Sequence, residues 1–295
     1  MIPPRRVLIS GGGIKVISIV GALTALEKAG TLVKVKEYCG VSAGAFLAFL
    51  LASGLPIHSI STLITELNFG IIRNMSPEAF LGFPELFGID DGSNLMRFLE
   101  SIIRVALKLN PELTFEEFAE NQAFRFRCWA TDLNNRSARE FSVETTPSVR
   151  IVDALRASMC LPLYFIPVVD PITGHMLSDG GIQGNLPLHH LTDDECQECI
   201  AIGFSKESHT SAPQDFMGFM NSVLDCLVHE RNETVLRKWY YKILRIPIDN
   251  YPSWNFEASR EDKEMLFSKG IAAVETWLKT AVMSARKISR RHSFS

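Results

Sequence analysis

The stretch KEYCGVSAGAFLAFLLASG, residues 36–54, decides the fold. A β-favouring run over residues 32–38 leads into the turn Gly40-Val41-Ser42-Ala43-Gly44, and an apolar helical run follows as far as Gly54. A serine between two glycines at a strand-to-helix turn is typical of a nucleophile elbow, where a strained backbone pushes the hydroxyl outward. The N-terminal N–H groups of the helix would face any negative charge that develops beside Ser42. The pentad alone also fits a structural turn with an idle serine, so its meaning depends on the rest of the chain.

A second glycine-rich turn, Ser10-Gly11-Gly12-Gly13-Ile14-Lys15, separates a short apolar strand over residues 5–9 from a helix predicted to end at Ala29. Consecutive glycines leave backbone N–H groups free to face one point at a helix N-terminus, which makes an anion site. Neither the P-loop nor the dinucleotide-binding spacing fits, because Val16 stands where the dinucleotide fingerprint requires its last glycine. Two interpretations are left. One is an oxyanion hole built from the glycines with Lys15 adding positive charge, and the other is a turn needed only for close packing.

A third segment, Asp179-Gly180-Gly181, ends a short extended run that begins near His175. An acid placed there, beside small residues, can reach a partner side chain in a confined space. Taken alone, however, the segment is an ordinary Asp-Gly turn.

Periodicity elsewhere predicts an alternation of helices and strands. Helices are expected over 57–67, 93–109, 149–159 and 216–228, a strand–turn–strand unit over 125–143, and further strands over 200–204 and 242–248. Thr114 with Glu117, and Ser259 with Asp262, are capping pairs that begin helices. Residues 69–88 are dense in phenylalanine and glycine, which favours core packing, with a hydrophobic lid over an acyl pocket as the alternative.

Length and composition limit the class of protein. The chain of 295 residues has no linker, repeat or low-complexity run, so we expect one domain over residues 1–295. A net charge of −3 argues against nucleic acid as a partner. The N-terminus lacks the features of a signal peptide, and the longest apolar run is too short to span a bilayer, which together favour a cytoplasmic protein.

The six cysteines of the chain are expected to be reduced. Cys196 and Cys199, with Cys226 and His229 further on, have a spacing similar to that of zinc ligands. Both pairs lie in apolar runs, however, which favours ordinary buried thiols, and we expect neither a metal nor a cofactor.

The segments SGGGIK, GVSAG and DGG, in this order, resemble those of the patatin-like phospholipases. Three further segments extend the resemblance over residues 5–248: ATDLNNRSAREFS, ALRASMCLPLYFIPV and DGGIQGNLPL. The resemblance implies a three-layer α/β/α sandwich with a mostly parallel central sheet. It also implies a Ser–Asp dyad that cleaves fatty acyl esters of glycerophospholipids or related glycerolipids through an acyl-enzyme.

Carried over by position, the resemblance makes Ser42 the nucleophile and Asp179 its partner. It assigns the oxyanion hole to Gly11, Gly12 and Gly13, and Lys15 matches the family's basic position, a candidate contact for an anion or lipid head group. Because aspartate is a weak base in water, burial would have to raise the pKa of Asp179.

Two departures from the family pattern bear on the oxyanion hole. The family usually has aspartate where Ser10 stands and glycine where Val16 stands. Valine does not readily take a positive φ, so a reshaped oxyanion hole with reduced activity is expected.

Two other functions compete with the dyad enzyme. A Ser-His-Asp hydrolase could use His189, His190 or His209. A non-catalytic lipid-binding or scaffold protein on a decayed hydrolase fold would use no catalytic group at all. The sequence leaves open whether a protein activator is needed. The C-terminal helix and basic tail, residues 259–295, fit two interpretations: peripheral association with membranes, or a solvated, frayed C-terminus.

Overall fold

The computed structural model describes residues 3–74, 81–205, 235–248 and 257–292, together with five single positions, 219, 222, 251, 253 and 255; side chains of the final helix are described as far as Lys279. One eight-stranded sheet forms the centre, in the order β10-β9-β1-β2-β4-β8-β7, with β5 pairing with β4. The strands are β1 Arg6–Ile9, β2 Glu37–Val41, β4 Arg125–Asp132, β5 Ser137–Phe141, β7 Val168–Val169, β8 Met176–Asp179, β9 Cys199–Phe204 and β10 Ile243–Ile246. A separate small sheet joins β3 Gly88–Asp90 to β6 Leu163–Phe165.

The sheet is mostly parallel, as predicted. Strands β10, β9, β1, β2 and β4 are parallel to one another, whereas β5 and β8 pair antiparallel with β4, and β7 pairs antiparallel with β8. Parallel strands need helical crossovers, and these cover the faces of the sheet. The main helices are α1 Val16–Lys28, α2 Ala43–Ala52, α3 Ile57–Glu66, α5 Phe83–Leu86, α6 Ser93–Ser101, α7 Phe115–Asn121, α8 Ile151–Ser158, α9 Asp193–Gln197 and α11 Arg260–His292.

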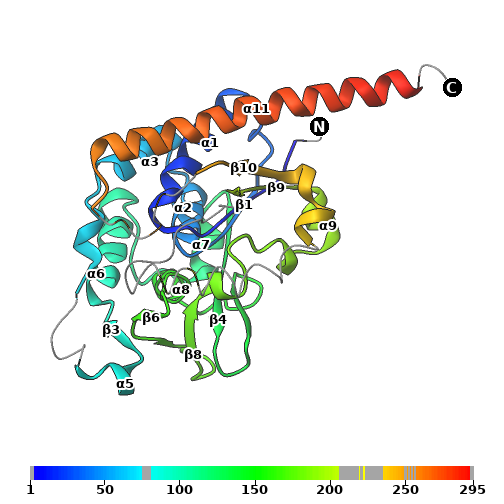
Figure 1. The fold of residues 1–295 in the computed structure, drawn as a ribbon. Helices are drawn as coiled ribbons and strands as arrows, with labels where there is room; N and C mark the ends of the chain where they lie inside the picture. The colour runs from blue at the N-terminus through cyan, green and yellow to red at the C-terminus, as the bar shows by residue number, and fades with distance from the viewer. Residues whose placement is uncertain are drawn as a thin grey trace.

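Alternating side chains of the strands divide the core into two layers. Val7 and Ile9 of β1 belong to the larger apolar cluster, which includes the buried faces of α1 and α2. Leu8 points the other way and joins a smaller cluster with Trp129 and Cys196. Helices therefore pack on both faces of one sheet, which confirms the predicted α/β/α sandwich (Figure 1).

Helices α1 and α11 approach one another closely at a pair of glycines. A Cβ added to Gly21 would lie 2.0 Å from the carbonyl oxygen of Phe267, and one added to Gly270 would lie 1.8 Å from that of Ser18. Only glycine allows backbones to come this near. Figure 1 shows α11 crossing over α1 on one side of the molecule, while α5, β6 and β8 lie on the opposite side.

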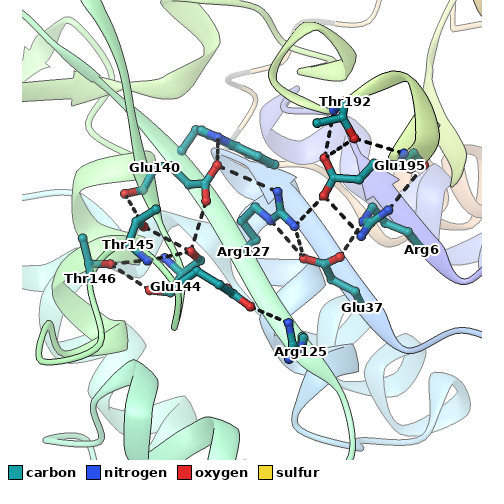
Figure 2. A network of polar contacts seen from close by, with 12 residues as sticks. Arg6, Glu37, Arg125, Arg127, Glu140, Glu144, Thr145, Thr146, Thr192 and Glu195 are labelled. Carbon is teal, nitrogen blue, oxygen red and sulfur yellow. Dashed lines mark hydrogen bonds and ion pairs between the residues drawn. The ribbon is translucent and has the colours of Figure 1, made fainter. Parts of the chain in front are cut away.

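A largely buried ion network ties the amino ends of three neighbouring strands together (Figure 2). Glu37 of β2 pairs with Arg6 of β1 and with Arg127 of β4, whose guanidinium donates to Glu37 Oε1 at 2.9 Å. Arg127 also donates to Glu195 of α9 at 2.9 Å. Removing one partner would leave an uncompensated charge, which is strongly destabilising in a buried site. The network fixes the relative positions of β1, β2 and β4 at the amino ends of these strands, opposite their carboxyl ends.

Several local predictions are confirmed by the hydrogen bonds. Thr114 and Glu117 form a reciprocal capping box at α7. At the start of α11 the Ser259 N–H donates to Asp262 Oδ2, and the Asp262 N–H donates to Ser259 Oγ. The helix expected over 93–109 continues past Ser101 as one π-helical turn, Ile102–Ala106.

Three sequence predictions need correction or stay open. The strand expected over 32–38 is wrong at its start, because Val35 N–H bonds back to Leu32 in a turn and the strand begins at Glu37. In the run 69–88, Phe69 packs against the core and Phe87 is half-exposed, while residues 75–80 lie outside the described part. Core packing and a lid both stay predictions for this run. The helix expected over 216–228 lies almost wholly outside the described residues. Among the helices that the structure describes, none combines the length and apolar character needed to cross a bilayer.

Candidate active site

Ser42 and Asp179 meet at the carboxyl end of β4. Ser42 directly follows β2, and Asp179 is the last residue of β8, the two strands that flank β4. Val41 is in register with Trp129 and Asp179 with Ala130, so both residues reach the same level of the sheet. Ser42 Oγ donates a hydrogen bond to Asp179 Oδ2 at 2.6 Å, and both side chains are buried. The structure thus brings together the two residues that the sequence singled out.

The backbone at Ser42 has the strained conformation expected of an elbow. Its φ of 55° and ψ of −132° are rarely adopted by a residue with a side chain, and such strain tends to occur at functional sites. The flanking glycines permit the turn, because a Cβ on Gly40 would lie 2.3 Å from Gly44 O and one on Gly44 would lie 2.4 Å from Ser10 O. α2 begins immediately afterwards, so its N-terminus faces the serine. The strain and the hydrogen bond favour a functional serine over an idle turn residue, and its catalytic role stays a prediction.

Ser158, at the end of α8, holds the elbow in place and was not identified from the sequence. The Ser42 N–H donates to Ser158 Oγ at 2.9 Å, and that hydroxyl donates to the carbonyl of Trp129 at 2.7 Å. Ser158 is completely buried. A single hydroxyl therefore links the backbone of Ser42 to β4, although the two serines lie 116 residues apart in the chain.

Replacing Ser158 with alanine is expected to weaken both fold and site. The buried Ser42 N–H and Trp129 carbonyl would lose their partner, which should lower the free energy of unfolding by about 1–3 kcal/mol. The elbow would then be free to shift, and a small misplacement of a nucleophile can reduce turnover by roughly 10²-fold. Urea denaturation and ester hydrolysis measure the two effects.

Ser53→Ala is the matched control for Ser158→Ala. The Ser53 hydroxyl donates to Phe49 O at 2.8 Å, at the opposite end of α2 from the elbow. Its removal should leave activity unchanged. Wild-type activity in folded Ser158→Ala would show that the hydroxyl does not position the nucleophile.

Asp179 is held by several hydrogen bonds in a site that favours its protonated form. Burial raises the pKa of Asp179 to about 6, although hydrogen bonds from Ser42 and from the Gly181 N–H act in the opposite direction. The Gly181 N–H reaches Asp179 Oδ1 at 2.7 Å, and the Asp179 N–H donates to Cys160 O at 2.7 Å. A carboxylate with a pKa near 6 is a better proton acceptor near neutral pH than an ordinary aspartate. This is the direction of shift that a base requires.

The glycine loop lies beside the elbow, but its three N–H groups are not equivalent. The Gly11 N–H donates to Asn185 O at 2.9 Å and is therefore already engaged. Gly12 and Gly13 adopt φ values of 155° and 55°, and their N–H groups find no acceptor among the described residues. These two amides are the ones available to an incoming anion.

The two departures from the family pattern do not distort this loop. Val16 adopts an ordinary helical φ of −55°, so the expectation of a reshaped oxyanion hole is wrong in its physical basis. Ser10 is buried, and its hydroxyl donates to Gly11 O at 2.8 Å, within the loop. Lys15 is buried too, with Nζ 5.7 Å from the centre of the Phe204 ring, a cation–π distance.

His190 and His175 have interaction partners other than Ser42 and Asp179. The His190 ring stacks on Trp129 at a centroid distance of 5.7 Å, and burial together with His189 lowers its pKa to about 4. His175 Nδ1 pairs with Asp132 at 2.8 Å, beyond the outer end of β8. In the part of the chain that the structure describes, no histidine is hydrogen-bonded to Ser42 or Asp179, and His209 lies outside that part.

The cysteines that suggested a zinc site are buried thiols where the structure describes them. Cys196 donates to Leu188 O at 3.5 Å, and burial raises its pKa to about 11. Burial likewise raises the pKa of Cys199. The described ranges contain no cluster of three or more histidine, cysteine or acidic residues able to hold a metal; Cys226 and His229 lie outside them.

The protein is an α/β sandwich in which a serine at a strand-to-helix turn is hydrogen-bonded to a buried aspartate. Comparisons with known proteins identify its family. The sequence model of the family described as patatin-like phospholipase matches residues 7–192. The chain therefore belongs to the patatin-like phospholipase family.

Individual relatives are distant in sequence. An uncharacterized protein of Acanthamoeba polyphaga mimivirus is 27% identical over 284 residues, which cover 92% of each chain. A probable lipid hydrolase of invertebrate iridescent virus 6 is 23% identical over 184 residues, 62% of each chain. Among solved structures, VipD from Legionella pneumophila has a similar fold, with a TM-score of 0.60 and 17% identity over 94% of this chain and 67% of that one.

Proposed function

We propose that the protein is a serine acyl hydrolase that cleaves fatty acyl esters of glycerophospholipids or related glycerolipids. The observation that carries the proposal is the 2.6 Å hydrogen bond from Ser42 Oγ to the buried Asp179 carboxylate. Membership of the patatin-like phospholipase family supports it, as does the similarity to a viral protein described as a probable lipid hydrolase. The reaction needs only groups that the chain itself supplies, and we expect no metal or cofactor.

The geometry supports a two-step mechanism. In the first step Ser42 Oγ attacks the ester carbonyl carbon while Asp179 Oδ2 takes the hydroxyl proton. Negative charge moves onto the carbonyl oxygen, which the N–H groups of Gly12 and Gly13 stabilise, at about 3–4 kcal/mol for each well-placed donor. Asp179 then gives its proton to the leaving alcohol. In the second step Asp179 takes a proton from a water molecule as the water oxygen attacks the acyl carbon, and it returns that proton to Ser42 Oγ as the bond to the fatty acid breaks.

A row of exposed apolar side chains beyond the end of β4 is suited to contact with a lipid surface. Val169 of β7 lies opposite Met176 of β8, and the N–H of Leu133, the residue that follows β4, donates to Met176 O, so the three residues are neighbours. Their exposures of 61%, 42% and 41% are high for large apolar groups. Leu133 lies three residues beyond Ala130, the level of Asp179, or roughly 10 Å further along the strand direction. Because Met176 and Asp179 are three residues apart in β8, their side chains point to opposite faces of the sheet, so the row lies near the site but not within it.

Acyl release from a panel of purified lipids tests the proposed function. Phospholipids with fatty acids at defined positions, lysophospholipids and triacylglycerol would each be incubated with the full chain, and free fatty acid would be measured. Release from at least one glycerolipid supports the proposal, and the preferred substrate defines head group and acyl position. A folded protein that releases acid from none of them would contradict it.

The alternative of a non-catalytic lipid-binding or scaffold protein loses its main support. It rested on the expected distortion at Val16, whose backbone is an ordinary part of the helix start. Binding of lipid without hydrolysis in the same panel would favour this alternative.

Peripheral membrane association through the C-terminal tail is a further part of the proposal. No acid follows Glu275, while basic residues accumulate: Lys279, Arg286, Lys287, Arg290 and Arg291. The side chains beyond Lys279 lie outside the described part of α11. Each basic residue near an anionic surface contributes about 1 kcal/mol. A cytoplasmic location and an activating partner both stay predictions from the sequence.

A chain that ends at Lys279 is expected to bind anionic vesicles more weakly than the full chain. Sedimentation with vesicles containing phosphatidylserine would measure the bound fraction, with neutral vesicles as the control for non-electrostatic binding. Binding that is unchanged by the truncation would reject the tail as a membrane anchor.

A further inference from the structure

Asn185 lies in the loop that follows Asp179, and this loop is tied directly to the glycine loop. The Asn185 carbonyl accepts the Gly11 N–H at 2.9 Å. Two tight turns fix the intervening residues, because Gln183 N–H bonds to Gly180 O and Gly184 N–H bonds to Gly181 O. The backbone of Asn185 is therefore held in place between the acid loop and the glycine loop.

The side-chain amide of Asn185 lies beside both members of the Ser–Asp pair. A Cβ built on Gly181 would lie 2.5 Å from Asn185 Oδ1 and 2.9 Å from Asp179 Oδ1. A Cβ built on Gly11 would lie 3.0 Å from Asn185 Oδ1 and 3.2 Å from Ser42 Cβ. The space beside Gly181 is therefore bordered by Asn185 Oδ1 and the Asp179 carboxylate, and the space beside Gly11 by Asn185 Oδ1 and the Ser42 side chain. Gly11 and Gly181 have no side chains, which leaves room for the Asn185 amide.

The amide is also accessible. Asn185 is exposed, whereas Ser42 and Asp179 are buried beneath it. Its side chain makes no hydrogen bond to any of the residues that the structure describes. A carboxamide carries two N–H donors and one carbonyl acceptor, so Asn185 has donors to offer to a bound ester.

We propose that Asn185 is a further catalytic residue, whose side-chain N–H donates a hydrogen bond to the alcohol-side oxygen of the ester. This inference rests on the proposed acyl hydrolase function. When the tetrahedral intermediate collapses, the bond from carbon to the alcohol oxygen breaks and its electron pair passes to that oxygen. The oxygen takes the proton held on Asp179, so it must lie within hydrogen-bond reach of that carboxyl group. A half-turn of the Asn185 amide exchanges Oδ1, the atom that faces the pair, for Nδ2 and brings a donor beside the same carboxyl group, where it stabilises the departing oxygen. Asn185 itself neither gains nor loses a proton.

Two esters with the same acyl chain and different alcohols test this role. A p-nitrophenyl ester releases a stable phenolate, whose oxygen needs little stabilisation. A glyceryl ester has an alkoxide leaving group, which is strongly basic and needs a hydrogen-bond donor and a proton. Asn185→Ala should lower kcat/KM for the glyceryl ester by roughly 10²-fold, the effect of removing one well-placed donor. The loss for the p-nitrophenyl ester should be only a few-fold. Because kcat/KM reports the steps up to acylation, the shared deacylation step does not mask the difference.

Gln183→Ala provides the matched control for Asn185→Ala. This amide lies in the same loop but donates away from the pair, to Arg136 O at 3.4 Å. Its loss should change kcat/KM for the two esters equally and by little. Circular dichroism and thermal unfolding would establish that each variant is folded.

A second variant keeps the inference testable if Asn185→Ala disturbs the loop. Asn185→Asp preserves the shape but replaces the donor with a carboxylate, so it should show the same selective loss for the glyceryl ester. It should also move the acid limb of the pH–rate profile to higher pH, because a second negative charge raises the pKa of Asp179.

Three outcomes would overturn the inference. Equal losses for the two esters would mean that Asn185 only shapes the loop, and no loss for either would mean that it has no part in the reaction. A folded wild-type protein that hydrolyses neither ester would contradict the proposed function itself, and with it this role.

Discussion

Ser42→Ala is expected to reduce acyl ester hydrolysis to the level of the uncatalysed blank. The Ser42 hydroxyl is the group hydrogen-bonded to the buried carboxylate, and without it no acyl-enzyme can form. The same substitution should abolish labelling by a fluorophosphonate, which reacts only with an activated serine. Mass spectrometry of the labelled wild-type protein should place the adduct on Ser42.

The variant should remain folded, because the change removes one oxygen atom and opens no cavity. Labelling that persists in Ser42→Ala would assign the nucleophile to another residue. Labelling of the wild type without hydrolysis of any lipid would separate an activated serine from the proposed lipid substrate.

Substitution of the histidines distinguishes the dyad from a triad. His189 and His190 stack near Trp129, on residues of the smaller core cluster, so replacing either one should leave activity largely intact. His209, in the part of the sequence that the structure does not describe, belongs in the same series. A single histidine variant without activity, together with an active Asp179→Asn, would show that the dyad assignment is wrong.

Asp179→Asn is expected to lower turnover by a factor on the order of 10³ or more, since it keeps the shape of the side chain but removes the proton acceptor. In the wild type, the pKa near 6 means that activity should fall as the pH drops below about 6, where the base becomes protonated. A profile of kcat/KM against pH with a single acid limb near that value would support Asp179 as the base. A limb near the ordinary aspartate value would contradict the raised pKa.

The same substitution should make the protein more stable at neutral pH. A carboxyl group whose pKa is raised from 3.8 to about 6 on folding contributes stability fully below 3.8, and that contribution is lost as the pH rises through 6. Asparagine has no such dependence. The stability advantage of Asp179→Asn over the wild type should therefore be small at pH 4 and grow to the order of 3 kcal/mol at pH 8.

Urea denaturation at both pH values measures this difference. Glu140→Gln on β5 is a suitable control, because its carboxylate lies outside the site, within hydrogen-bond range of Trp129 Nε1. An advantage of Asp179→Asn that is independent of pH would show that the ionised carboxylate is not destabilised by burial.

The parts of the site that the sequence predicted are those encoded within a few residues. The elbow at Ser42, the glycine loop and the acid before two glycines each require a particular spacing, and local spacing is visible in a sequence. Ser158 and Asn185 were missed because their roles depend on contacts with segments far away in the chain. A buried serine in a helix looks the same whether its hydroxyl binds its own helix or a nucleophile's amide.

The errors in the fold have a related cause. Residues 32–35 are β-favouring by type, but a local turn and the register of β2 with β1 decide where the strand begins. The ion network of Arg6, Glu37 and Arg127 joins three strands that only the folded sheet brings side by side. The prediction at Val16 is wrong because the family's glycine at this position does not imply a positive φ. In this loop Val16 has a helical φ of −55°.

The glycine contact between α1 and α11 has a consequence for where the functional unit ends. The family match stops at residue 192, yet Gly270 of α11 seats against α1, the helix that leaves the glycine loop. Ser253 reaches the loop as well, since its carbonyl accepts the Ile14 N–H at 2.9 Å. A fragment trimmed to the match would lack β9 and β10, leave β1 as an unpaired sheet edge and bare the apolar side of α1, two features that invite aggregation. The chain beyond residue 192 therefore packs against the candidate oxyanion loop and the helix that follows it, and helps to hold the loop in place.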